Sequence, residues 1–288
     1  MRLLTHLVND EERLAVAVDD HVAVDVADLL GDGPWTMTRL LSNPSGSLDA
    51  LRGALERDPG SSARPIASLR LLAPVRPAKI IAVGRNYREH AAEEAAALPS
   101  APLLFAKFPS SVVGDGATIT WSAALTAEVD YEAELAVVIG RRARDVDLDR
   151  ALDYVLGYSC LNDVSARDLQ VSDGQWTRAK SLDTFCPMGP WLVTVDEVPD
   201  LGALRVQCRV NGEPRQDAST AELVHGVAEL ISYCSRSFTL EPGDVIATGT
   251  PGGVGAFRDP PVFLADGDTV EVEIDRVGTL TNRCRVVA

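Results

Sequence analysis

The sequence predicts an α+β protein, with a small N-terminal α+β domain at residues 1–70 and a larger domain at residues 71–288. Helix-like and strand-like segments do not alternate regularly, which argues against a doubly wound sheet or a TIM barrel. The 288 residues suffice for one large domain or two ordinary ones, and 46% of them are hydrophobic, enough for a sizeable core. A stretch rich in Pro, Ser and Gly between Asn43 and Ser68 marks the boundary.

The N-terminal domain is expected to combine short strands with one helix. Residues 14–18 and 21–26 read as short strands. The irregular connection after them carries Asn-Pro-Ser-Gly-Ser at 43–47 and Pro-Gly-Ser-Ser-Ala-Arg-Pro at 59–65. A short helix is expected between these two runs, at 48–56.

The larger domain is expected to begin with a strand and a helix. Residues 79–83 form a short apolar strand, and residues 88–97 are rich in Ala and Glu, which favour helix. Continuous apolar runs at 135–139 and 156–161 predict two buried strands, and Gly140 ends the first of them.

The C-terminal part is expected to hold one helix among several strands. Residues 221–236 repeat apolar side chains at helical spacing. Residues 204–210 run into Asn211-Gly212, a dipeptide typical of hairpin turns. Residues 268–274 alternate apolar and acidic side chains like a half-buried strand, and 279–287 close the chain as another strand.

Composition narrows the function classes. Lys and Arg total 27 against 42 Asp and Glu, a net charge of −15, which argues against nucleic-acid or anionic membrane partners. No apolar run approaches the ~20 residues of a membrane span, and acidic residues near the N-terminus come too early for a signal peptide. The five cysteines are scattered without a C-x-x-C pair, so reduced thiols and a cytoplasmic location are expected.

Three acidic residues lie at strand ends. Glu132 and Glu134 precede the buried run 135–139, and their spacing points both side chains to one face. Asp163 follows the second buried strand. Paired carboxylates at the head of an apolar strand favour a hard divalent cation such as Mg²⁺, Mn²⁺ or Ca²⁺. The alternatives are a solvated strand face for the glutamates and a helix cap for Asp163.

Other segments suggest chemistry less specifically. His90 and Glu93 share one helix face at i, i+3 and could form a base with its orienting group, or be an incidental surface pair. Cys186 could be a nucleophile or an inert buried thiol. The Gly-rich run after residue 248 satisfies neither phosphate-binding pattern, and the absence of G-x-S-x-G argues against a serine hydrolase.

Together these stretches resemble the fumarylacetoacetate hydrolase family, including its bacterial acylpyruvase and fumarylpyruvate hydrolase-like members. The resemblance runs from about residue 72 to the C-terminus and rests on residues 83–90, 130–140, 162–170, 180–190 and 240–255. It implies a mixed β-roll with helices, a homodimer, and a small leading domain at the N-terminus.

The resemblance also implies roles for individual residues. Glu132, Glu134 and Asp163 would bind Mg²⁺ or Mn²⁺. His90 would activate water, oriented by Glu93, and Lys180 would stabilise the developing enolate. The residues expected to hold substrate oxygens are Arg167, Gln170 and Thr250. A further acidic ligand found in some members is replaced by Ala82-Val83 here, which fits the branch acting on smaller substrates.

These roles imply a hydrolase that cleaves a C–C bond in an acylpyruvate or another 2,4-diketo acid. Decarboxylation of a β-keto acid such as oxaloacetate, and isomerisation of an unsaturated oxo-diacid, would use the same site. A non-catalytic metal-stabilised binding protein is the alternative of a different class, and the presence of His90, Glu93 and Lys180 argues against it. Candidate walls for the substrate are Phe105, Lys107, Phe108, Ser110 and Gln175-Trp176.

Overall fold

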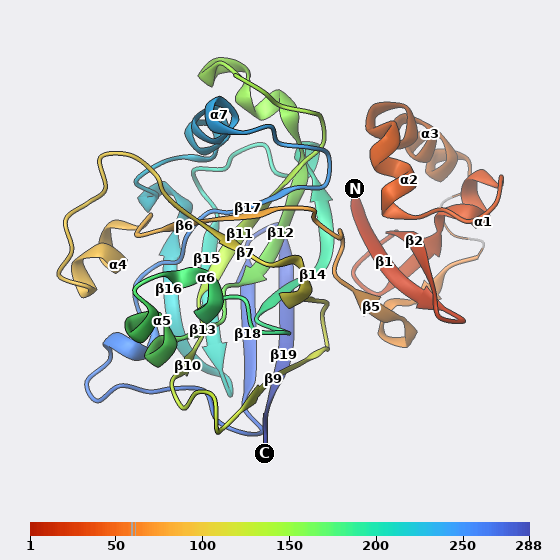
Figure 1. The fold of residues 1–288 in the computed structure, drawn as a ribbon. Helices are drawn as coiled ribbons and strands as arrows, with labels where there is room; N and C mark the ends of the chain where they lie inside the picture. Colours follow the sequence, from red (N-terminus) through yellow and green to blue (C-terminus); the bar gives the residue numbers. More distant parts are fainter. Residues whose placement is uncertain (59, 61) are drawn as a thin grey trace.

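The computed structural model describes residues 1–58, 60 and 62–288, which fold around one large sheet, one smaller sheet and one two-stranded sheet (Figure 1). The strands are β1 (Arg2–Val8), β2 (Glu11–Ala17), β3 (Val22–Asp25), β4 (Arg64–Pro65), β5 (Arg70–Leu72), β6 (Ile80–Gly84), β7 (Leu103–Lys107), β8 (Val112–Val113), β9 (Thr118–Ser122), β10 (Val129–Asp130), β11 (Ala133–Ile139), β12 (Val155–Asn162), β13 (Ser165–Ala166), β14 (Cys186–Thr194), β15 (Arg205–Val210), β16 (Glu213–Ser219), β17 (Val245–Ala247), β18 (Thr269–Ile274) and β19 (Gly278–Val287). The helices are α1 (Val26–Leu30), α2 (Met37–Ser42), α3 (Pro44–Arg57), α4 (Arg88–Glu93), α5 (Arg167–Asp173), α6 (Trp176–Ala179) and α7 (Val227–Ser237).

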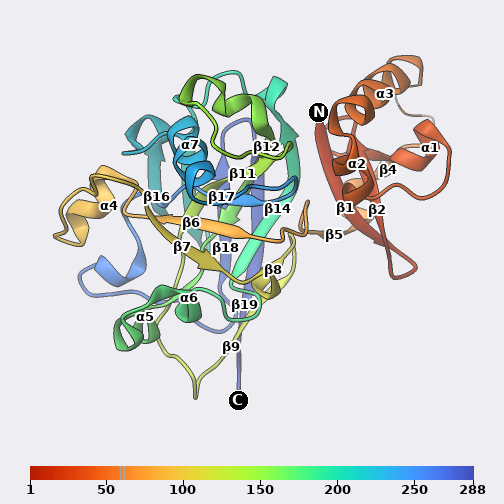
Figure 2. The same ribbon diagram turned by 45° about the horizontal axis from the view of Figure 1, so that its top comes forward.

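The large sheet is mixed. Its order is β4-β3-β2-β1-β14-β12-β11-β17-β6-β7, with β5 beside β1 and β8 beside β14. Strands β6 and β17 run parallel, whereas β11 pairs antiparallel with both β12 and β17. The smaller sheet has the order β16-β15-β18-β19-β9, and the helices lie around these sheets (Figure 2). This arrangement confirms the predicted α+β class.

The N-terminal strands continue the sheet of the larger domain. Strand β1 pairs with β14 through Arg2 opposite Val193 and Leu3 opposite Leu192. Helices α1, α2 and α3 cover this part of the chain at one side of the molecule (Figure 1). The boundary near residue 70 stays a prediction, and Pro59 and Ser61 of the expected connection lie outside the described residues.

The two predicted buried strands form the centre of the molecule. Every residue of β11 and β12 is buried, and their side chains enter core clusters on both faces of the sheet. These continuous apolar runs therefore hold the ends of both strands in fixed positions. The candidate site lies where β11 begins and β12 ends.

Two predicted helices are shorter than their sequence patterns suggested. Helix α4 ends at Glu93 instead of residue 97, and Ala95 beyond it has a left-handed backbone with φ 50°. Helix α7 begins at Val227 instead of residue 221, because the N–H groups of Val224 and His225 both donate to Asn86 instead of to a preceding helical turn.

The described residues contain no helix that is both long and apolar enough to cross a membrane. All five cysteines are free and buried. Burial raises the pKa of Cys186 to about 12, so its thiol is protonated at neutral pH and the reading as an inert thiol is the one that the structure favours.

Candidate active site

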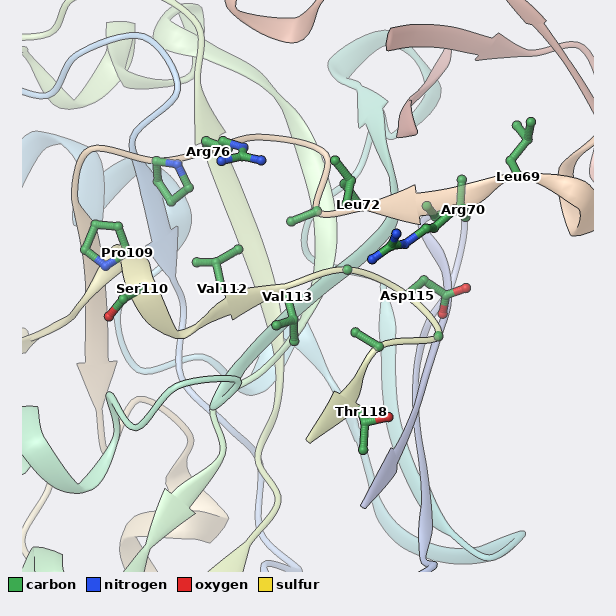
Figure 3. Close-up of a pocket in the computed structure, with 16 residues that line it drawn as sticks. Leu69, Arg70, Leu72, Arg76, Pro109, Ser110, Val112, Val113, Asp115 and Thr118 are labelled. Carbon is green, nitrogen blue, oxygen red and sulfur yellow. The ribbon is translucent and has the colours of Figure 1, made fainter. Parts of the chain in front are cut away.

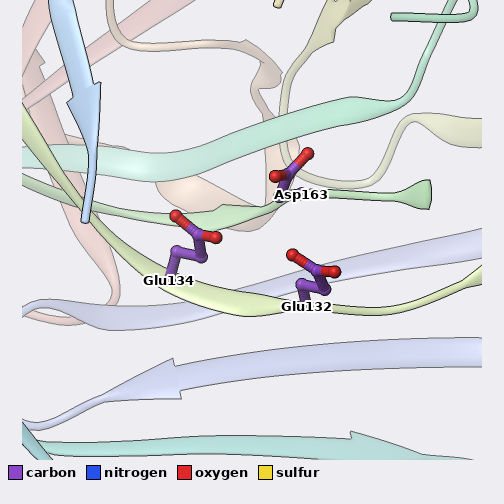
Figure 4. Close-up of side chains that lie close together, drawn as sticks. All are labelled: Glu132, Glu134 and Asp163. Atoms are coloured by element: carbon purple, nitrogen blue, oxygen red, sulfur yellow. The ribbon is translucent and has the colours of Figure 1, made fainter. Parts of the chain in front are cut away.

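Three buried carboxylates meet where β11 begins and β12 ends. The Asp163 N–H donates to the Glu132 carbonyl at 2.9 Å, which continues the ladder between the two strands. Glu132 and Glu134 point to one side, toward Asp163 (Figure 4). One oxygen from each carboxylate lies within 4.8 Å of the others, and all three residues are buried. The structure thus brings together the carboxylates predicted to bind a metal.

This close approach changes the proton affinities of the carboxylates. Burial, with the carboxylates of Asp163 and Glu132 nearby, raises the pKa of Glu134 well above its ordinary value. Burial would also raise the pKa of Glu132, but the positive charges of Lys180 and Arg167 lower it to about 2. Of the carboxylates in this cluster, Glu134 is therefore the one whose negative charge the protein's own cations compensate least.

Two buried lysines donate to these carboxylates. Lys180 Nζ donates to Glu132 Oε2 at 2.8 Å, to Asp163 Oδ2 at 2.9 Å and to Ser165 Oγ at 2.8 Å. Lys107 Nζ donates to Asp163 Oδ1 at 2.6 Å and to the carbonyl oxygen of Lys180. Burial would lower the pKa of Lys180, but Asp163 and Glu132 raise it, so this ammonium stays charged at neutral pH.

Arg167 and Gln170, both predicted to hold substrate, lie side by side. Arg167 Nη1 donates to Gln170 Oε1 at 3.0 Å, and its Nε donates to Asp130 Oδ2 at 2.9 Å. Arg167 Nη2 lies 2.8 Å from Glu132 Oε1, yet has no well-aligned acceptor among the described residues. The other oxygen of Asp130 accepts the Gly255 N–H at 2.7 Å, which fixes the arginine relative to the glycine-rich loop.

His90 on α4 lies between two glutamates at the C-terminal end of that helix. Its Nδ1 is 3.6 Å from Glu93 Oε2, and its Nε2 is 3.2 Å from Glu94 Oε1. Burial would lower the His90 pKa, but the two carboxylates raise it to about 9. Glu94 also accepts the Arg85 Nε–H at 2.6 Å. The predicted pair is brought together, but Glu94 is the nearer partner, and its i, i+4 spacing could have revealed it.

The glycine-rich loop after β17 binds the protein's own carboxylates with its backbone amides. The Gly249 N–H donates to Glu134 Oε2 at 2.8 Å, and the Gly253 N–H donates to Glu93 Oε1 at 2.7 Å. Thr250, predicted to contact substrate, donates its hydroxyl to the main-chain carbonyl of Ala133 at 3.0 Å. The loop therefore links α4 to the carboxylate cluster, a role that its sequence did not reveal.

The predicted catalytic and substrate-binding residues, except Glu93, share one small pocket. His90, Arg167, Gln170, Lys180 and Thr250 all line it, together with Glu132 of the carboxylate cluster. The space inside is about 10 Å³, which is close to that of one water molecule. A substrate therefore requires side chains or α4 to move before it can enter.

Only some of the candidate wall residues line this pocket. Phe105 and Trp176 do so, and their rings meet edge to face at 5.2 Å between centroids. Phe108 is 53% exposed and does not line the pocket. Ser110 lines a separate cavity of about 860 Å³ beside β5 and β8 (Figure 3). The larger cavity contains none of the residues predicted to be catalytic or metal-binding.

The donors of the carboxylate cluster fit a hard divalent cation. They are three buried carboxylates, and Glu134 is poorly compensated by the protein's own charges. Such oxygen ligands suit Mg²⁺, Mn²⁺ or Ca²⁺ better than zinc or copper. A bound cation would offset the burial and the nearby carboxylates that raise the Glu134 pKa.

Comparison with known proteins shows what most of this chain is similar to. Residues 79–285 match the model of the fumarylacetoacetate hydrolase C-terminal domain. The chain is 44% identical over 253 residues to the mitochondrial oxaloacetate tautomerase FAHD2A of Bos taurus, covering 87% of this chain and 80% of that protein.

Two solved structures are similar to this chain over the full length of both chains compared. The fumarylacetoacetate hydrolase from Exiguobacterium antarcticum is 39% identical with a TM-score of 0.86. The maleylpyruvate hydrolase from Sphingobium sp. SYK-6 is 36% identical with a TM-score of 0.82. From the match of residues 79–285, these similarities and the shared fold, we conclude that the chain belongs to the fumarylacetoacetate hydrolase family.

Proposed function

We propose that this chain is a metal-dependent enzyme that forms or protonates the enolate of a short 2-oxo acid. One observation carries the proposal: two buried cations, Lys180 and Arg167, line the pocket between the carboxylate cluster and His90. This arrangement offers positive charge where an enolate would develop and a proton carrier on the other side.

The metal would be held by Glu132, Glu134 and Asp163, with Mg²⁺ or Mn²⁺ as the expected ion and Ca²⁺ as the alternative. When bound, such an ion supplies a Lewis acid for the oxygens of a 2-oxo acid. The same positive charge explains how a protein with a net charge of −15 would accept an anionic substrate.

The protein's own residues would bind the substrate and move the proton. Lys180 stabilises negative charge on the enolate oxygen, and Arg167 with Gln170 binds a carboxylate or carbonyl group through free N–H groups. His90 transfers the proton, while Glu93 and Glu94 position its ring. Phe105 and Trp176 exclude water from one side of the pocket.

Tautomerisation between the enol and keto forms of a 2-oxo diacid is the first candidate reaction. The relative that is 44% identical over most of this chain is an oxaloacetate tautomerase. With a pKa of about 9, His90 carries a proton at neutral pH, which suits protonation of the enol carbon.

Hydrolysis of a C–C bond in an acylpyruvate or another 2,4-diketo acid is the second candidate. The maleylpyruvate hydrolase at 36% identity over the whole chain favours it. This reaction requires His90 to be neutral so that it can accept a proton from water. Decarboxylation of oxaloacetate would use the same cations without an attacking water.

A parallel assay separates these reactions. Purified protein is treated with EDTA and then assayed with Mg²⁺ or Mn²⁺ for loss of enol oxaloacetate absorbance, for pyruvate released from oxaloacetate, and for cleavage of acetylpyruvate and maleylpyruvate. We expect metal-dependent tautomerisation that is lost in His90→Ala. Cleavage without tautomerisation would establish the hydrolase, pyruvate release from oxaloacetate the decarboxylase, and inactivity on every substrate would refute the proposal.

Two further expectations concern assembly and location. We propose that the chain assembles as a homodimer, as the family resemblance implies, and that it acts in the cytoplasm, as its scattered cysteines indicate. Sedimentation of the purified protein at micromolar concentration tests the first expectation, and a monomer under these conditions would contradict it.

A further inference from the structure

Lys107 is a buried cation whose position the proposed reaction does not explain. It is 1% exposed and lies at the end of β7, outside the pocket lined by His90, Arg167 and Lys180. Its ammonium makes two hydrogen bonds, one to Asp163 and one to the carbonyl of Lys180. A buried lysine requires hydrogen-bond partners of this kind, but these partners do not explain why a lysine occupies this position.

The two oxygens of Asp163 have different surroundings. Oδ1 accepts from Lys107 at 2.6 Å, and this lysine is not among the residues that line the pocket. Oδ2 accepts from Lys180 at 2.9 Å, and Lys180 lines the pocket. A charge-assisted hydrogen bond on each oxygen fixes the carboxylate plane. Oδ2 is therefore the oxygen bound to a pocket-lining residue, and Oδ1 is bound to a residue outside the pocket lining.

We propose that Lys107 is a positioning residue that keeps Asp163 a one-oxygen metal ligand and thereby favours Mg²⁺ or Mn²⁺ over Ca²⁺. The inference rests on the metal site proposed above. Mg²⁺ requires six ligands in near-ideal octahedral geometry, whereas Ca²⁺ takes six to eight oxygens and accepts both oxygens of one carboxylate. Because Lys107 binds Oδ1, this oxygen is not available as the second carboxylate ligand that only Ca²⁺ would use.

A purely mechanical role for Lys107 would leave part of its geometry unexplained. The end of β7 is already tied to the segment around Lys180, because the Phe108 N–H donates to Ser181 Oγ at 3.0 Å. A neutral donor could also satisfy the Lys180 carbonyl. What the lysine adds is a charged donor at Asp163 Oδ1, within the cluster of three carboxylates.

The ratio of two metal affinities tests this role. Removing a positive charge changes the attraction of the site for every divalent cation, but Mg²⁺ and Ca²⁺ carry the same charge. This common effect cancels in the ratio of their dissociation constants, whereas an added carboxylate oxygen does not. Lys107→Met should therefore shift the ratio toward Ca²⁺ by roughly tenfold or more, the scale on which outer-shell partners act.

The measurement is titration calorimetry of EDTA-stripped, dialysed protein with Mg²⁺ and with Ca²⁺. Lys107→Gln is the second variant, because it keeps a polar group in the site, and its side chain is one atom too short to reproduce the lysine contact. Ser181→Ala is the matched control, since it loosens the same segment and leaves the charge at Asp163 intact. We expect both Lys107 variants to shift the ratio and the control to keep it.

The possible results test the proposed metal site and the positioning role of Lys107 separately. Wild-type protein that binds neither ion would refute the proposed metal site, and the role of Lys107 with it. Binding by wild type with an unchanged ratio in a folded Lys107 variant would overturn the positioning role alone. An equal shift in Ser181→Ala would assign the effect to loosening of the segment, and would likewise overturn it.

Discussion

Replacement of Glu134 by Gln should stabilise the metal-free protein while abolishing its response to metal. Glu134 is 1% exposed, and burial with the carboxylates of Asp163 and Glu132 raises its pKa well above the ordinary value of 4.5. Gln has nearly the same shape, and its carbonyl oxygen can still accept the Gly249 N–H that donates to Glu134 at 2.8 Å. The substitution therefore removes the charge and keeps the hydrogen bond.

The size of the gain has an upper bound. In the unfolded chain Glu134 ionises with the ordinary pKa of 4.5. At pH 7 its buried charge therefore costs the folded protein at most about 3 kcal/mol of stability, because a larger cost would make Glu134 take up a proton instead. The loss is absent below pH 4.5 and grows as the pH rises toward the folded-state pKa. The variant's advantage should follow the same pH dependence.

Thermal unfolding with and without metal measures both effects. In EDTA at pH 7, Glu134→Gln should melt several degrees above wild type, with about 2–4 °C for each kcal/mol. Metal at 100 times its dissociation constant should stabilise wild type by about 2.7 kcal/mol and should leave the variant unchanged. Glu56→Gln, on the exposed part of α3, controls for the substitution itself.

Two results would refute this reasoning. A metal-free variant no more stable than wild type at pH 7 would mean that burial and the neighbouring carboxylates do not penalise the charge of Glu134. A variant that metal stabilises as much as wild type would mean that Glu134 is not a ligand.

Two further predictions concern α4 and the glycine-rich loop. His90 has a folded-state pKa of about 9, above its ordinary 6.5. Its protonation therefore contributes up to about 3 kcal/mol to folding stability below pH 6.5, and this contribution is lost as the pH rises through 9. Denaturant titrations of metal-free wild type across this range should show the decline, and His90→Gln should flatten it; an equal slope in both proteins would contradict the assignment. In the loop, a Cβ at Gly249 would lie 2.7 Å from Asn86 Cβ and 2.9 Å from the Val83 carbonyl oxygen, at φ +98°. Gly212→Ala, at φ +78° with nothing within 4 Å, has similar backbone strain without a clash. Gly249→Ala should therefore be about 1–3 kcal/mol less stable than Gly212→Ala in denaturant titrations, and equal stabilities would show that the loop shifts freely.

The central strands and the carboxylate cluster could be predicted because they depend on local patterns. Continuous apolar runs predicted β11 and β12, and the two-residue period of a strand placed Glu132 and Glu134 on one face. Asp163 was recognisable because it directly follows a buried strand. Antiparallel pairing of the two strands then brings it beside Glu132.

The contacts that complete the site depend on strand order, which local patterns do not contain. Lys107 was named only as a candidate wall, because its contact with Asp163 joins residues 56 positions apart. The amides of Gly249 and Gly253 bind glutamates more than a hundred residues away, so the loop could be recognised as glycine-rich but not assigned a role. Helix α4 was predicted too long, because helix-favouring composition continues past the left-handed Ala95.

Strand β7 places two different determinants of the enzyme on one face of one short segment. Phe105 and Lys107 are two residues apart, so they project to the same side; the first packs against Trp176 in the pocket, and the second holds Asp163. In the described part of the sheet, β7 is an edge strand that pairs with β6 alone. Substitutions in β7 that are selected for a new substrate would therefore also change which metal the site prefers. Natural variants in β7 should diverge in both properties together, and a library that randomises these two positions jointly should reach combinations that single substitutions miss.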